Sequence, residues 1–184
     1  MKRLTLILLL AGVAVSAAAR PAAAQEALAG PYKLDMKFGP SLGIVDASGS
    51  QFRLEFHFGI NLTPQLPHHI YLDFPLGFGF GNGFTDILIV PGVEADIALP
   101  VGVPLYIYPM FGLGVGFFFP SCPANFQCST TTALGIRLGA GVKYVLQGRY
   151  NFFFEPLNLE FYPAGFEGAT PGFYNLLFGG GFNF

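Results

Sequence analysis

Hydrophobic and polar residues alternate strictly along the last twelve residues, 173–184. One parity carries large apolar side chains and the other carries small or polar ones: Tyr174, Leu176, Phe178, Phe182 and Phe184 against Asn175, Gly179, Gly181 and Asn183. Because successive side chains of a strand point to opposite faces, the pattern predicts a β-strand with one strongly apolar face. In water such a face needs a second protein layer, whereas lipid covers it in a membrane-embedded barrel.

Seven earlier segments alternate in a similar way, and the full set covers residues 33–44, 51–62, 69–80, 85–99, 105–119, 132–146, 150–161 and 173–184. In each segment the charges and glycines lie opposite the large apolar residues. The segment 150–161 changes phase near Pro156, where a β-bulge would restore one polar face. The sequence therefore predicts an all-β protein, an eight-stranded antiparallel up-and-down transmembrane β-barrel with both ends on one side of the membrane.

Phenylalanine content indicates which face of this barrel points outward. The chain has 22 Phe, which would overfill a narrow lumen, whereas glycine and paired charges fit there. We therefore expect the Phe, Leu and Ile face to contact lipid. The alternative is a soluble lipocalin-like barrel with the phenylalanines inside.

The N-terminal residues have the three parts of a secretory signal. Lys2 and Arg3 precede an apolar run over residues 4–15, and small residues with an A-x-A site at 22–24 follow. We predict a signal peptide over residues 1–24 and a barrel domain over residues 25–184. Cleavage after Ala19 and an uncleaved membrane anchor are the alternatives.

Composition narrows the classes of function. Only 11% of the residues are charged and 52% are hydrophobic, yet no segment after the signal has 18 consecutive apolar residues. Removing the signal takes away three of the nine basic residues and leaves eleven acidic ones, so no basic patch for nucleic acid remains.

Taken together, the export signal, the amphipathic strands and the terminal Phe resemble the small bacterial outer-membrane β-barrels of the OmpA transmembrane-domain and OmpX type. Gly179, Phe182 and Phe184 match that family's C-terminal assembly signal, while Leu177 stands where the signal has a polar residue. The resemblance implies delivery to the bacterial outer membrane, with outer-membrane lipid and the assembly machinery as partners. OmpA adds a peptidoglycan-binding domain, and because this chain ends at the predicted barrel we do not carry that role over.

Charged residues of the inward parity form the candidate site. They are Lys33, Asp35, Lys37, Arg53, Glu55, His57, Asp73, Glu94, Asp96, Arg137, Lys143, Glu155 and Glu160. Buried charges are costly unless paired, so we interpret them as a structural network that plugs the lumen. We expect Arg53 and Glu55 near Lys37 and Asp73, and Arg137 near Glu94 or Glu155. A gated ion path or a small-ligand pocket is the alternative.

Other candidate residues have simpler interpretations. Cys122 and Cys128 lie in the third outer connection, and in an oxidising compartment they should form a disulfide rather than a redox or metal site. His57 with Glu55 and Ser41 is the best arrangement for a hydrolase, but no motif supports it. We expect His68 and His69 in a solvated turn, and no metal or cofactor. The eight tyrosines suggest an interfacial girdle.

The function that this sequence favours is an integral outer-membrane protein with a structural or surface-interaction role and no catalysis. A narrow channel or carrier for small solutes is the alternative, because the glycine-rich parity leaves room for a cavity. An outer-membrane lipid-modifying enzyme is the third possibility. The oligomeric state does not follow from the sequence.

Overall fold

A computed structural model describes residues 30–47, 49–81, 83–121, 129–166 and 168–184. The predicted signal peptide and both cysteines lie outside these residues. In the described part the secondary structure is strand throughout: β1 (Tyr32–Val45), β2 (Ser50–Asn61), β3 (His69–Gly81), β4 (Phe84–Ile89), β5 (Gly92–Ala98), β6 (Leu105–Pro120), β7 (Thr131–Leu146), β8 (Tyr150–Ala164) and β9 (Gly172–Asn183). Within these residues there is no helix long and apolar enough to cross a membrane.

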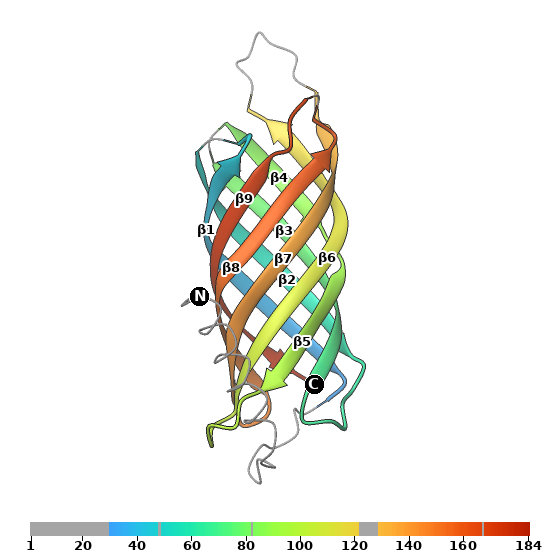
Figure 1. Ribbon diagram of the computed structural model, residues 1–184, viewed down its shortest axis with the longest axis vertical. Helices are drawn as coiled ribbons and strands as arrows, with labels where there is room; N and C mark the ends of the chain where they lie inside the picture. Colours follow the sequence, from blue (N-terminus) through green and yellow to red (C-terminus); the bar gives the residue numbers. More distant parts are fainter. Residues whose placement is uncertain (1–29, 48, 82, 122–128, 167) are drawn as a thin grey trace, which may run out of the picture.

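All neighbouring strands pair antiparallel, and the sheet closes on itself (Figure 1). β1 pairs with β2 on one side and with β9 on the other. At that seam the Tyr32 N–H donates to the Phe184 carbonyl, and the Phe184 N–H donates to the Tyr32 carbonyl, each at 3.0 Å. The predicted antiparallel up-and-down barrel is confirmed.

β4 and β5 together form one interrupted strand of the barrel. Both pair with β3 and both pair with β6, so β4 and β5 count as one strand and the barrel has eight strands around its wall. The sequence predicted an unbroken strand over residues 85–99, but the strand is interrupted at Val90 and Pro91. Proline has no backbone N–H to donate to the ladder, which explains the interruption at this position.

Two local features of the backbone shape β8, a tight turn before it and a bulge within it. Gln147 and Gly148, in the three-residue connection between β7 and β8, have φ values of 53° and 67°, and the Arg149 N–H donates to the Leu146 carbonyl at 3.1 Å to close a tight turn. The β8–β9 register shifts between Glu155 and Asn158, which is the predicted bulge at Pro156. Because of this bulge, Glu155, Asn158 and Glu160 all point into the barrel.

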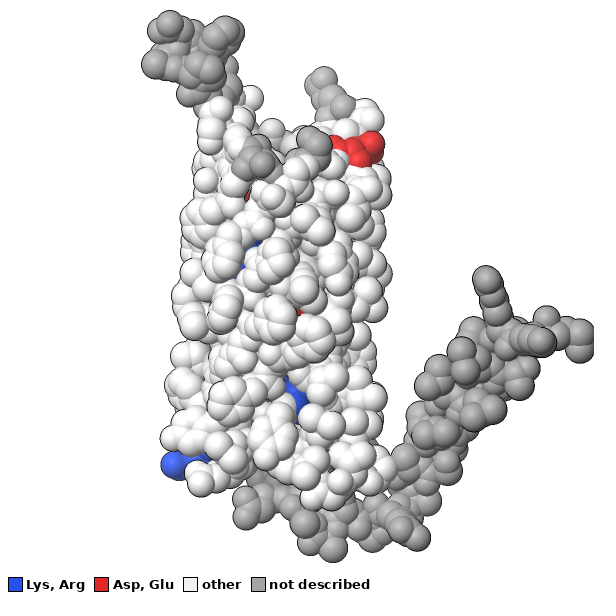
Figure 2. All heavy atoms as spheres, turned by 90° about the vertical axis from the view of Figure 1, so that its left-hand side faces the viewer, with Lys and Arg blue, Asp and Glu red and all other residues white. Residues whose placement is uncertain are grey.

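Every strand of the barrel has large apolar side chains that point outward. Phe56 in β2 is 42% exposed and Leu138 in β7 is 46% exposed, whereas their charged neighbours along the strands are buried. Figure 2 shows one face of the barrel that is almost entirely without charged side chains between its two ends. The soluble barrel with its phenylalanines inside is therefore excluded as an arrangement of this chain.

Two apolar clusters close the interior toward its ends. Leu88, Val90, Phe118, Ala133, Tyr162 and Phe173 form one cluster, near the end that carries the β3–β4, β6–β7 and β8–β9 connections. Tyr71, Tyr106 and Val145 form the other, near the opposite end.

Candidate functional site

Inward-pointing charged side chains fill the middle of the barrel. The structure places every predicted member inside, each at most 2% exposed, and adds Asp86 of β4 to them. The strand alternation explains this burial, because all of these residues have the inward parity. Five Lys or Arg side chains and His57 face eight carboxylates in this space.

Two arginines connect the carboxylates in the part of the network nearest the β3–β4 connection, which is called its upper part here. Arg53 contacts Asp86, and its Nη2 lies 2.9 Å from Glu160 Oε2. Arg137 Nη1 lies 4.0 Å from Glu160 Oε1, and Arg137 Nη2 lies 2.6 Å from Glu55 Oε2. Glu160 therefore connects the two guanidinium groups.

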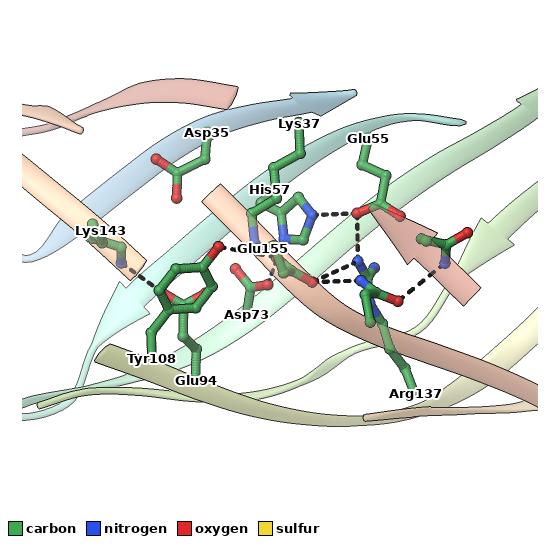
Figure 3. Close-up of polar contacts among 12 residues, drawn as sticks. Asp35, Lys37, Glu55, His57, Asp73, Glu94, Tyr108, Arg137, Lys143 and Glu155 are labelled. Carbon is green, nitrogen blue, oxygen red and sulfur yellow. Dashed lines mark hydrogen bonds and ion pairs between the residues drawn. The ribbon is translucent and has the colours of Figure 1, made fainter. Parts of the chain in front are cut away.

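His57 lies at the centre of the network, between two carboxylates. Its Nε2 is 2.8 Å from Glu55 Oε2 and its Nδ1 is 2.6 Å from Asp73 Oδ2 (Figure 3). Carboxylate oxygens accept hydrogen bonds, so this geometry suits a ring that donates from both nitrogens, which is the charged form. Beside it, Lys37 Nζ lies 2.7 Å from Glu155 Oε2, and the Tyr108 hydroxyl donates to the same oxygen at 3.1 Å.

Two lysines connect the carboxylates in the lower part of the network, toward the opposite end of the barrel. Lys33 Nζ lies 3.4 Å from Asp73 and 2.7 Å from Glu94. Lys143 Nζ lies 2.6 Å from Glu94 and 2.7 Å from Asp96. Acids and bases thus alternate without interruption through eleven side chains: Asp86, Arg53, Glu160, Arg137, Glu55, His57, Asp73, Lys33, Glu94, Lys143 and Asp96.

The ion pairs in the structure differ from those that we expected from the order of neighbouring strands. Arg53 pairs with Asp86 and Glu160 rather than with the side chains of its adjacent strands. Of the two partners expected for Arg137, Glu155 lies 3.7 Å away, while the contact with Glu55 was not anticipated. Long side chains cross the narrow lumen, so the opposite wall supplies partners that register between neighbouring strands does not reveal.

Four tyrosines occupy the interior, which corrects the expectation of an interfacial girdle. Tyr71, Tyr106, Tyr108 and Tyr162 are at most 1% exposed, whereas Tyr32, Tyr144 and Tyr150 point outward. The inward tyrosines have the inward parity of their strands, which Tyr71 shares with Asp73 and Tyr162 shares with Glu160. Two of them take lysine ammonium groups over their rings: Lys33 lies 4.7 Å from the Tyr71 centroid and Lys37 lies 4.8 Å from the Tyr108 centroid.

Two histidines and the residues of the C-terminal assembly signal are the remaining candidates. His68 is exposed, but His69 is 1% exposed and its Nδ1 lies 3.1 Å from the Asn61 amide, so only the first histidine matches the expected solvated turn. In β9, Leu177 and Gly179 face inward while Phe182 and Phe184 face outward with their rings 5.4 Å apart. Over the described residues, no group of three or more His, Cys, Asp or Glu side chains is arranged to hold a metal ion.

Comparisons with known proteins agree with this architecture. No protein-family model matches the sequence, and no curated protein matches it. Among solved structures, Neisserial surface protein A has a TM-score of 0.63 at 12% identity, covering 84% of this chain and 97% of that one. The N-terminal β-barrel domain of Pseudomonas aeruginosa OprF has a TM-score of 0.54 at 16% identity, covering 83% and 97%. The chain has the fold of the small outer-membrane β-barrels.

A further solved structure of similar fold is the outer membrane enzyme PagL, with a TM-score of 0.51 at 18% identity, covering 80% of this chain and 97% of that one. At such identities the likeness extends to the fold alone. The fold expected from the resemblance to OmpA and OmpX is thus confirmed, and the role of this chain has to be argued from its own residues.

Proposed function

We propose that this protein is an integral barrel of the bacterial outer membrane whose lumen is closed, and that it serves a structural or surface-contact role without catalysis. The observation that carries the proposal is the unbroken alternation of acid and base from Asp86 to Asp96. Its apolar exterior supports placement in lipid, and the fold that it shares with outer-membrane barrels supports that membrane.

A closed lumen follows from the energetics of the network. Removing a buried ion-pair partner leaves an uncompensated charge, which typically costs several kcal/mol. An ion passing through the barrel would have to separate several such pairs and also displace the apolar clusters at both ends. The side chains of an eight-stranded barrel are numerous enough to fill its interior.

Planar-bilayer recording tests the closed lumen. We expect no stable single-channel openings from the purified, folded protein, because the ion pairs block the path. Stable ion-selective openings would contradict this and support the alternative, a narrow channel. In that case Glu94→Gln and Arg53→Gln would alter the selectivity, since both residues line the path.

The geometry around His57 argues against a lipid hydrolase at this position. A serine hydrolase needs a histidine nitrogen that is free to take the proton of the nucleophile. Both ring nitrogens of His57 already face carboxylates, at 2.8 and 2.6 Å. Ser41 is buried on β1, but the ring has no nitrogen left to activate it.

We also propose that residues 1–24 are removed on export and that Cys122 and Cys128 pair. Five residues separate the two cysteines, which follow β6 in the sequence. Closing so small a loop should contribute roughly 2–3 kcal/mol at most. We expect no titratable thiol in the unreduced protein under denaturing conditions and two after reduction, and two thiols before reduction would contradict the pairing.

A further inference from the structure

The β1–β2 turn and the β8–β9 connection lie at the same end of the barrel (Figure 1). Residues of both connections line a pocket at this end. Its volume is about 400 Å³, within the range of small-molecule sites. Its walls are largely aromatic and apolar, and Phe84, Phe118, Phe166 and Phe173 contribute most of the rings. The closed-lumen proposal gives this space no role.

The aromatic walls are held in place by ring contacts, of which three are edge-to-face and one, between Phe84 and Phe118, is tilted. The Phe118 ring lies 5.0 Å from Phe166 and 4.8 Å from Tyr162, and Phe84 lies 6.0 Å from Phe118 and 6.2 Å from Phe173. Such packing keeps the rings oriented without filling the pocket. Preorganised rings of this kind bind cations over their faces as well as apolar groups.

The charge around the pocket is negative. Asp46 lines the rim, is exposed, and accepts a hydrogen bond from the Thr170 N–H at 2.9 Å. No described residue forms an ion pair with it. Below the pocket, Tyr162 packs against Phe118 and Phe173 and donates from its hydroxyl to Glu160 at 3.2 Å.

We propose that this mouth pocket binds a small organic cation with an apolar body, such as an aryl or alkyl ammonium ion. The apolar body lies against the phenylalanine rings and the positive group faces the Asp46 carboxylate. Aromatic surface provides the apolar contact, and charge complementarity with Asp46 selects a cation over a neutral molecule of the same shape. The inference is independent of whether the lumen conducts.

The test compares two probes of one shape on the full chain in nonionic detergent micelles. Benzyltrimethylammonium carries the charge, and neopentylbenzene is its neutral isostere. Backbone amide shifts of the residues that line the pocket report binding. We expect saturable shifts with benzyltrimethylammonium, weaker binding at higher salt, and weaker or no saturable shifts with neopentylbenzene.

Two variants separate the contributions. Asp46→Asn keeps an oxygen for the Thr170 N–H and suits the positive φ of 46°, so it removes only the charge. It should weaken binding of the cation roughly three- to tenfold. Phe166→Leu keeps apolar volume but removes a ring face and should also weaken it. Equal binding of the two probes, together with an unchanged affinity in Asp46→Asn, would overturn the cation proposal, and the absence of saturable shifts would overturn the site itself.

Discussion

Replacing Arg137 by methionine is expected to lower the free energy of unfolding by roughly 3–5 kcal/mol. Arg137 Nη2 lies 2.6 Å from Glu55 and 3.7 Å from Glu155, and Nη1 lies 4.0 Å from Glu160, all within the closed interior. Methionine keeps an unbranched side chain but leaves these carboxylates with an excess of negative charge. Urea unfolding in detergent micelles measures the change, followed by circular dichroism because the chain has no tryptophan.

A double-mutant cycle with Glu55 separates pairing from packing. If Glu55 is costly in Arg137→Met because it has lost its partner, then Arg137→Met combined with Glu55→Gln should lose less stability than the sum of the two single changes. We expect a coupling of about 1–3 kcal/mol between the two residues. Arg137→Lys, which keeps the charge, should lose less than Arg137→Met. Strictly additive losses would contradict a shared ion pair.

Strand pattern and inward parity were predictable because the alternation is local. Each side chain of a strand points away from the previous one, so the sequence itself assigns Phe56 outward and Glu55 inward. The bulge at Pro156 was also predictable, because the polar residues of this segment occupy odd positions up to Glu155 and even positions from Asn158 onward. Asp86 was not among the predicted inward residues, although it has the same parity as Glu94 and Asp96 in the segment 85–99 and could have been assigned with them.

The partners within the lumen could not be predicted in the same way. Which side chains meet across a barrel depends on strand tilt and stagger, and neither leaves a trace in the alternation. Lys37 of β1 reaches Glu155 of β8, with β9 lying between the two strands. The inward tyrosines differ from these partners, because they have the inward parity of their strands and the alternation was therefore sufficient to assign them to the interior.

The mouth pocket needed the structure for its discovery. Phe84, Phe118, Phe166 and Phe173 come from three strands and one connection, and only closure of the barrel brings their rings together. Asp46 joins them because its turn meets the β8–β9 connection at Thr170, 124 residues later in the chain. No local pattern in the sequence could have revealed this juxtaposition.

Placing an arginine at Phe56 is expected to cost roughly 2–4 kcal/mol of stability in a bilayer. Phe56 is 42% exposed on the outer face and lies midway along β2, so its replacement would put a charge into the hydrocarbon region. Urea unfolding of protein folded into liposomes measures this cost. Leu146→Arg is the matched control, because Leu146 is also 42% exposed but ends β7, where arginine should cost about 0–1 kcal/mol.

A second control changes the inner face. At Gly77 an added methyl group would lie 3.4 Å from Leu88 Cβ and 3.6 Å from Glu55 Cγ, an ordinary packing distance, so Gly77→Ala should cost less than about 1 kcal/mol. Gly139 would serve less well, since the methyl group there would lie 2.7 Å from Met110 Cγ. If Phe56→Arg costs no more than Leu146→Arg, the outer surface of the barrel is not in contact with acyl chains. The placement of this protein in a membrane would then be wrong.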